Sequence, residues 1–455
     1  MALGAGERWL SFGGTPRGLA ENIAFADWSP TGELAVVRNT GAKRQLDYPL
    51  GTLLFETPGY VMNPRVSPNG EHVAFLHETP AGVTELLVVD RRGQTRALSI
   101  APATGASRPR NFSSQDGSGL AWVPSGEEVW FTTDNGNAIW ASALSGGRKL
   151  IYQGVYEMRL EDISSSGSVL VNARASRREL AFLPPGQQRE RGLSWLAWTH
   201  LAALSDDGQQ VLFSSSEGEG TFTYMRSTDG ALPVRLGPGE PFALSPDGEW
   251  VLSLSNEAPD VLSLLPVGPG FAKTISVNGI QVRRARWLQD GKRIVFLGLA
   301  PKGSSLQLYV VPVTGGVPRL ISETPLRPFY FEVSRDDRLV AARPLNDIVT
   351  LFPVDGGTAI QLTELPKEKE LVPFGWDAQG ALWLRSFREL PCRVLRYDVS
   401  NRHVLEERVL APADPTGLVV ISQAFITPDG KAMAFDYVRT LGSLYLLDGL
   451  APPRH

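Results

Sequence analysis

The stretch LSPDGEWVLS, residues Leu244–Ser253, determines the fold because versions of it recur along the whole chain. It begins with a large apolar residue, continues with a Ser-Pro-Asp-Gly phrase and ends in alternating apolar residues. Proline fixes φ at the second position of a turn, aspartate hydrogen-bonds to its own backbone, and glycine accepts a positive φ. The stretch therefore predicts a strand, a tight turn and a returning strand, which together form a β-hairpin.

Ten copies of this phrase follow one another in the 455 residues. Aligned on the glycine of the turn, successive copies are separated by 38 to 56 residues. In one copy Asp337 replaces the glycine, and because aspartate tolerates a positive φ better than most residues, we expect the turn to survive there. The other copies carry Gly32, Gly70, Gly126, Gly167, Gly208, Gly248, Gly291, Gly380 and Gly430.

A second hairpin follows most copies, as in LYVVPVTGGVPRLI (Leu308–Ile321) and VTLFPVDGGTAIQL (Val349–Leu362). Two hairpins make a four-stranded antiparallel sheet, and no amphipathic helix separates the copies. Sheets of this size packed radially bury both of their faces and protect their edges. We therefore predict an all-β fold, a β-propeller built from about ten four-stranded blades.

Ten blades exceed the four to eight of a usual ring, so two architectures stay open. The first is two tandem propellers: residues 1–190 would form a partial blade and four repeats, and residues 191–455 six repeats. The second is a single large propeller over residues 1–455. We expect Leu444–Leu450 to be the third strand of the last blade. Trp9–Leu19 has the pattern of a second hairpin, which either completes that blade or follows repeats upstream of Met1.

These phrases also resemble a known family. The Ser-Pro-Asp-Gly turns, with Gly-Gly-x-Pro-Arg returns at Gly13–Arg17 and Gly315–Arg319, are similar to the WD40-like (PD40) repeats of TolB-type β-propellers. More narrowly, the chain resembles the C-terminal propeller region of bacterial eukaryotic-like serine/threonine protein kinases. The stretches that carry this narrower resemblance are Gly13–Arg38, Gly59–Leu76, Leu410–Leu418 and Arg439–Leu450.

The resemblance implies an outward-facing sensor or protein-binding module that follows a kinase domain and a membrane helix. The chain has no glycine-rich ATP loop, His-Arg-Asp motif or Asp-Phe-Gly motif, so kinase activity does not carry over. It shows no signal peptide or spanning segment, and the resemblance implies an extracytoplasmic location if further sequence precedes Met1. With 44 basic and 48 acidic residues and no long basic run, nucleic acid is not the expected partner.

No catalytic, cofactor-binding or metal-binding constellation stands out in the sequence. A zinc site needs clustered ligands, and the scattered histidines are therefore interpreted as surface or loop side chains. These histidines are His72, His77, His200, His403 and His455. Cys392 shows no neighbouring base and is not expected to be a nucleophile, and no Gly-x-Ser-x-Gly motif marks a serine hydrolase.

Three other groups of residues have structural explanations. The acidic pairs Asp206-Asp207 and Asp336-Asp337 occupy the repeat's turn, and Asp134–Asn137 fits an ordinary hairpin loop better than a calcium site. Tryptophans of the apolar column are expected in the core between blades; they are Trp28, Trp122, Trp287 and Trp376. A basic group interleaved with glutamates is expected on a solvated face; it comprises Arg177, Arg178, Arg189 and Arg191.

The sequence thus favours a non-catalytic binding or sensor scaffold that holds a protein or a small ligand at one end of the propeller, where loops gather. The main alternative is a propeller hydrolase or lactonase with a metal held by scattered carboxylates in the channel, because such a site needs no contiguous motif. A further alternative is the accessory propeller of a peptidase encoded elsewhere.

Overall fold

A computed structural model of the chain describes residues 19–40, 43–79, 84–100, 119–132, 136–196, 198–217, 220–254, 258–366, 370–387 and 389–450. Their regular structure consists of β-strands, so the all-β prediction is confirmed. None of these residues belongs to a helix of the length and apolarity that a membrane crossing requires. Contacts divide the chain into unit 1, Met1–Ala175 with Leu441–His455, and unit 2, Ser176–Thr440.

The described residues of unit 1 form three four-stranded sheets, followed by a further first strand, β13. The first strands of successive sheets, β1, β5, β9 and β13, contact one another in this order, and apolar clusters fill the spaces between the sheets. The strands are β1 (Ile23–Trp28), β2 (Leu34–Thr40), β3 (Lys43–Asp47), β4 (Leu53–Thr57), β5 (Tyr60–Val66), β6 (His72–Glu78), β7 (Thr84–Asp90), β8 (Thr95–Ile100), β9 (Gly119–Trp122), β10 (Glu128–Thr132), β11 (Ala138–Ala143), β12 (Arg148–Gln153) and β13 (Glu157–Ile163).

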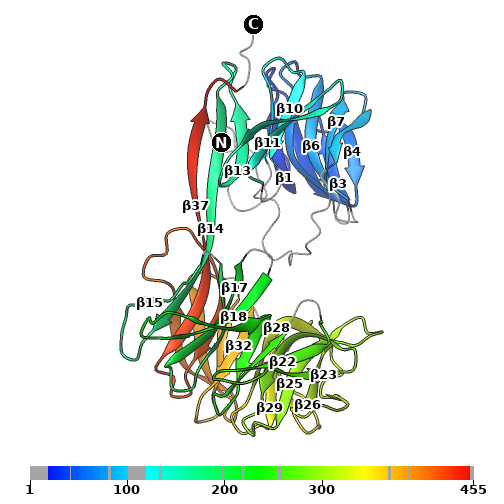
Figure 1. Ribbon diagram of the computed structural model, residues 1–455. Helices are drawn as coiled ribbons and strands as arrows, with labels where there is room; N and C mark the ends of the chain where they lie inside the picture. The colour runs from blue at the N-terminus through cyan, green and yellow to red at the C-terminus, as the bar shows by residue number, and fades with distance from the viewer. Residues whose placement is uncertain are drawn as a thin grey trace. The chain divides into compact units, whose positions relative to one another are not determined.

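Two long strands, β14 (Val169–Leu183) and β37 (Met433–Leu447), are neighbours in one sheet, and the division between the units falls within both of them (Figure 1). The sequence placed the boundary near residue 190 instead. The prediction of a separate third strand at Leu444–Leu450 was wrong, because Gly442 lacks the positive φ of a turn and β37 continues through it. Most of Trp9–Leu19 lies outside the described residues.

Unit 2 contains six successive groups of strands, each with the hairpin of the repeat. The first strands β16, β20, β24, β28, β32 and β36 each contact the next, and β36 contacts β16, so their order closes into a ring. The strands are β15 (Arg191–Gly192), β16 (Thr199–Leu204), β17 (Gln210–Glu217), β18 (Gly220–Ser227), β19 (Val234–Pro238), β20 (Glu240–Leu244), β21 (Trp250–Leu254), β22 (Val261–Pro266), β23 (Lys273–Ser276), β24 (Gln281–Trp287), β25 (Arg293–Leu299), β26 (Leu306–Pro312), β27 (Arg319–Leu320), β28 (Leu326–Val333), β29 (Leu339–Pro344), β30 (Thr350–Pro353), β31 (Ile360–Gln361), β32 (Leu371–Trp376), β33 (Leu382–Ser386), β34 (Cys392–Asp398), β35 (His403–Leu410) and β36 (Leu418–Ile426).

Apolar burial holds this ring together. Six clusters of buried side chains lie between neighbouring strand groups of unit 2, one for each junction. The closing junction packs Phe425 and Ala434 of the last group against Leu201 and Phe213 of the first. Because each sheet exposes two apolar faces, closing the ring removes the faces that an open row of sheets would leave in water.

All ten copies of the repeat form the predicted turn. The glycines of the turn column have positive φ values from 64° to 87°, and Asp337 has a φ of 61°. In every copy the amide of this residue donates to the carbonyl three residues earlier, as Gly248 does to Ser245 at 2.9 Å. The turn prediction, including the Asp337 exception, is therefore confirmed.

The ten hairpins are distributed over about eight antiparallel sheets, rather than ten, in the part of the chain that is described. One sheet combines two copies because the single pair Leu306–Leu326 joins β26 to β28. Another combines two copies because β14 and β37 bring β13 and β36 into the same sheet, with β15 pairing to β14. The repeated antiparallel sheets define a β-propeller fold, and the sheet count differs from the repeat count for these two local reasons.

Candidate functional site

A cluster of charged and polar side chains connects the six strand groups of unit 2. We term it the ring cluster. Each group contributes at least one residue, and most of these side chains are buried or half-buried. The ring cluster consists of Arg178 (β14), His200 (β16), Glu240 (β20), Arg284 and Arg286 (β24), Tyr330 and Glu332 (β28), Arg385 (β33), Ser422 and Gln423 (β36) and Asp436 (β37).

Arg286 and Glu332 form the most complete ion pair of the ring cluster. The guanidinium donates from Nε to Oε2 at 3.1 Å and from Nη2 to Oε1 at 3.0 Å. Its Nη1 donates to the backbone carbonyl of Phe242 in β20. The side chains of the pair are only 9% and 12% exposed, and the two parallel hydrogen bonds match the fork of a guanidinium to a carboxylate. These two charges therefore compensate each other.

Arg284 reaches across the ring. Its Nη1 donates to Gln423 Oε1 at 3.3 Å, although β24 and β36 occupy opposite places in the order of first strands. Its contact to Glu332 Oε1 is long, at 3.5 Å, and its buried Nε has no hydrogen-bond partner. Burial, followed by the nearby charge of Arg286, lowers the pKa of Arg284 to about 9. Arg284 is therefore a buried cation that lacks a carboxylate of its own.

Two other arginines also lack a direct carboxylate partner. Asp436 accepts the backbone amides of Leu201 at 2.8 Å and Gln423 at 2.9 Å, and the Arg178 Nε lies 3.7 Å from its Oδ2, beyond hydrogen-bonding distance. Burial raises the pKa of Asp436. Arg385 donates to the backbone carbonyls of Ile421, at 3.1 Å, and Ser422, which leaves its charge without a carboxylate.

His200 and Glu240 lie at the end of the ring where the first strands begin. The His200 Nδ1 is 3.8 Å from Glu240 Oε1, and burial together with Arg178 and Arg284 holds the pKa of His200 well below its ordinary value. The protein around Glu240 raises the pKa of this carboxyl, although its side chain is 44% exposed. Exposure thus rises from Arg286 to Glu240, so solvent reaches the ring cluster from this end.

The opposite end of unit 2 carries the turns of the repeat. There Arg335 pairs with Asp206 through both of its terminal nitrogens, one of them 2.9 Å from Oδ1. These residues belong to the turns after β28 and β16, which occupy opposite places in the ring order. The ion pair therefore connects turns across the ring at this end.

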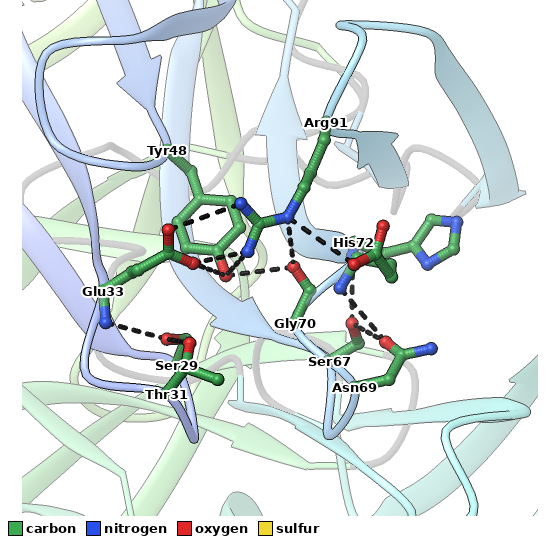
Figure 2. A network of polar contacts seen from close by, with 10 residues as sticks. Ser29, Thr31, Glu33, Tyr48, Ser67, Asn69, Gly70, His72 and Arg91 are labelled. Atoms are coloured by element: carbon green, nitrogen blue, oxygen red, sulfur yellow. Dashed lines mark hydrogen bonds and ion pairs between the residues drawn. The ribbon is translucent and has the colours of Figure 1, made fainter.

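Unit 1 has polar networks of a different kind. Arg65 donates to the carbonyls of Leu120 and Glu161 at 2.9 Å, and its backbone neighbour Val66 donates to Asp27 at 2.7 Å. Figure 2 shows a second network, in which the Arg91 guanidinium lies against the Glu33 carboxylate and the Gly70 carbonyl. These groups find their partners within the unit, so the networks act as joints between sheets.

The structure corrects several expectations about single residues. His77 and His200 are not surface imidazoles: His77 is buried, with Nε2 2.9 Å from the Thr57 hydroxyl, and His200 lies in the ring cluster. Arg178 is not on a solvated face: its backbone forms an isolated bridge with Trp198, and its side chain is only 14% exposed. Arg177, Arg189 and Arg191 are exposed as expected.

The remaining sequence candidates do not form a site. His403 is exposed and His72 is half-buried, whereas His455 and Asp134-Asn135 lie outside the described residues. Cys392 is buried, and this burial raises the pKa of its thiol. Among the described residues, no three His, Cys, Asp or Glu side chains are grouped so that they could hold a metal ion.

The tryptophan column lies between sheets, as predicted. The Trp122 Nε1 donates to the Arg65 carbonyl of the preceding sheet at 2.9 Å, and the Trp376 Nε1 donates to the Glu332 carbonyl at 3.2 Å. Trp287 is buried in an apolar cluster that joins two sheets. Trp28 is the exception, since it is 46% exposed.

Sequence reasoning missed the ring cluster, but one column of the repeat contains a signal. The residue just before the large apolar position is charged in five of the ten copies: Asp27, Arg65, Asp162, Arg286 and Glu332. Each is the next-to-last residue of a first strand, and a charge on a strand that packs between other sheets needs a partner or a ligand. Two neighbouring columns hold further cluster residues: His200, Glu240 and Ser422 lie four positions before the large apolar residue, and Arg284, Tyr330 and Gln423 lie three positions before it. Arg178, Arg385 and Asp436 lie outside the first strands and could not be found in this way.

The chain matches no family model and no curated protein. Among solved structures it is similar to oligogalacturonate lyase from Vibrio parahaemolyticus, with 15% identity over 56% of this chain and 76% of that chain and a TM-score of 0.37. TolB from Acinetobacter baumannii is 15% identical over 71% of this chain and 80% of its own, with a TM-score of 0.29. The tricorn protease is 9% identical over 89% and 45%, with a TM-score of 0.29. These likenesses concern the fold alone, and the resemblance to kinase-associated propellers stays a prediction.

Proposed function

We propose that the chain is a non-catalytic binding protein made of two propeller-type units, and that the ring cluster of the six-bladed unit 2 is its binding centre. The ring cluster carries this proposal, because all six strand groups supply polar side chains to one place that solvent reaches from one end. Loops and first strands around a ring form the concave, convergent polar sites that proteins use for recognition.

The chemistry of the ring cluster supports binding better than covalent catalysis. Ser422 is the hydroxyl nucleophile of the cluster, and its buried Oγ has no hydrogen-bond partner, so no base activates it. His200 stays neutral between two arginines and serves as a polar contact. The sequence resemblance to kinase-associated propellers adds two further parts to the proposal, a sensor role in signalling and a location outside the cytoplasm.

A hydrolase or lyase is the second candidate, and Glu240 is the observation that favours it. A carboxyl with a raised pKa that solvent reaches suits general acid–base chemistry, and a neutral imidazole lies 3.8 Å away. In this case Glu240→Gln would abolish turnover of a substrate. If the chain is instead a binding protein, neither the wild type nor Glu240→Gln would turn over a substrate.

Affinity capture with the full chain tests the proposal. The bait is the wild-type protein, compared with Arg284→Ala in the ring cluster and with Arg338→Ala, a matched variant of a side chain that is 83% exposed in a turn. We expect a reproducible partner or small ligand that is retained by Arg338→Ala and lost by Arg284→Ala. Equal retention by both variants, or turnover of a ligand by the wild type, would contradict the proposal.

A further inference from the structure

We infer that the ring cluster binds an anion, a carboxylate or phosphate group held between Arg178 and Arg284 beside His200. This inference rests on the proposed function, since it specifies the ligand of the same site. It follows from three observations: the balance of buried charges, the donors that lack acceptors and the direction from which solvent enters.

The charge balance of the ring cluster is positive. It contains four arginines, Arg178, Arg284, Arg286 and Arg385, against three carboxyl groups, Glu240, Glu332 and Asp436. Even with all three carboxyls ionised, the sum is one positive charge. An excess of buried positive charge is unfavourable, so a bound anion would stabilise the site.

Shared neighbours bring the unpartnered donors into one region of the ring. The Asp436 carboxylate lies 3.7 Å from the Arg178 Nε and accepts the amide of Gln423, whose side-chain oxygen accepts Arg284. The buried Nε atoms of Arg178 and Arg284 have no acceptor, and neither does the Nδ1 of His200. Both arginines are close enough to lower the pKa of His200, which places the imidazole in the field of both. Two guanidinium groups and a neutral ring that can donate one hydrogen bond are a suitable set of donors for a carboxylate or a phosphate.

Glu240 is the cluster carboxyl at the solvent-facing end. Its carboxylate lies 3.8 Å from the His200 Nδ1, and its side chain is partly in solvent. A ligand can therefore enter beside it without displacing an internal ion pair. The indole of Trp198, whose ring lies 5.8 Å from the Arg178 guanidinium, stands at the same end and offers a flat apolar surface to the rest of a ligand.

Isothermal titration of the full chain at pH 7 tests the inference, with inorganic phosphate and citrate as separate probes at constant ionic strength. We expect saturable binding of at least one probe, and the comparison of the two distinguishes a phosphate from a carboxylate ligand. Arg284→Gln should weaken binding about tenfold or more, because a charge-assisted hydrogen bond is lost. The matched Arg338→Gln should bind as the wild type does.

A variant with the opposite effect separates binding from folding. Glu240→Gln removes a negative charge beside the site while leaving a half-exposed side chain of the same size, so it should tighten the binding of the same probe. A merely structural role of these residues would not strengthen binding. The inference is overturned if neither probe binds the wild type, or if Glu240→Gln fails to tighten binding. If the anions fail but Arg284→Ala still loses a captured partner, the proposed function stands and the anionic ligand is wrong.

Discussion

Asp337 shows how one residue of the repeat acquires a second role. It occupies the turn position that glycine holds in the other nine copies, with a φ of 61°. Its carboxylate accepts the backbone amides of Gln289 at 2.6 Å and Asp290 at 2.9 Å, which belong to the turn after β24. A glycine would adopt this backbone more easily but would offer no acceptor to the neighbouring turn.

We predict that Asp337→Ala destabilises unit 2 more than Asp337→Gly does. Alanine loses both hydrogen bonds, which costs about 2 kcal/mol, or roughly 4–8 °C in melting temperature for a unit of this size, and it keeps the Cβ that the wild type already has at positive φ. Glycine loses the hydrogen bonds but relieves the backbone, so it should recover about half of that decrease. Differential scanning calorimetry measures both shifts. Equal melting temperatures for the two variants would show that the backbone contributes nothing.

Gly248 provides a test of the turn itself. Its φ is 75° and no atom approaches within 4 Å of where a Cβ would lie, so only the backbone conformation opposes a side chain there. We expect Gly248→Val to lower the melting temperature of unit 2, with a cost of about 1–2 kcal/mol, because a β-branched residue is strongly disfavoured at positive φ. Gly268→Val is the matched control: the space around Gly268 is equally free and its φ is not positive. A similar loss in both variants would refute this explanation.

At the scale of elements, the network in Figure 2 joins the sheet β1–β4 to the sheet β5–β8. Arg91, which follows β7, contacts Glu33 in the turn after β1, donates to the Gly70 carbonyl at 2.8 Å and lies over the Tyr48 ring at 4.8 Å. The Tyr48 hydroxyl also donates to the Gly70 carbonyl, at 3.0 Å. The Arg91 side chain thus connects the first hairpins of the two sheets at Glu33 and Gly70. Directed polar contacts of this kind fix the relative position of the hairpins more specifically than apolar packing does.

We predict that this joint weakens in acid. The hydrogen bond from Arg91 lowers the pKa of Glu33 below its ordinary value of 4.5, so the stabilisation is present above pH 4.5 and is lost as the pH falls through the lowered value. The difference in melting temperature between the wild type and Arg91→Met should therefore be largest near pH 7 and shrink below pH 4.5. Arg92→Met, the exposed neighbour outside the network, should show no such dependence. A difference that is constant with pH would contradict the role of Glu33.

The sequence predicts hairpins well because their causes are local. The turn after β20 needs only Pro246, Asp247 and Gly248, and all ten turns form as expected. The ring cluster depends on pairs such as Arg284 with Gln423, 139 residues apart, which no local pattern reveals. The sheet count also depends on long-range pairing, because β37 joins β14. Local rules therefore account for the elements, whereas the site requires the tertiary arrangement.

At the scale of the whole molecule, the last strand group of unit 2 is assembled from two distant parts of the chain. Strands β36 and β37 come from the C-terminal part, and β14 and β15 come from the middle. The hydroxyls of Ser176 and Thr440, at the two limits of unit 2, are 3.0 Å apart. Adjacent ends are typical of a domain inserted into another, which can fold when it is separated from the rest.

We predict that the fragment 176–440 folds by itself, whereas the fragment 191–455, which follows the boundary expected from the sequence, does not form a stable ring. Fragment 176–440 keeps the unit 2 part of β14 beside β37, so the six apolar junctions of the ring stay intact. The other fragment loses β14, and β37 then has an unpaired edge that favours aggregation. In calorimetry, fragment 176–440 should unfold cooperatively. Its melting temperature should be close to that of unit 2 in the full chain, which is the transition that Gly248→Val is expected to lower. A transition of equal temperature in fragment 191–455 would show that β14 is not needed to close the ring, and would return the boundary to residue 190.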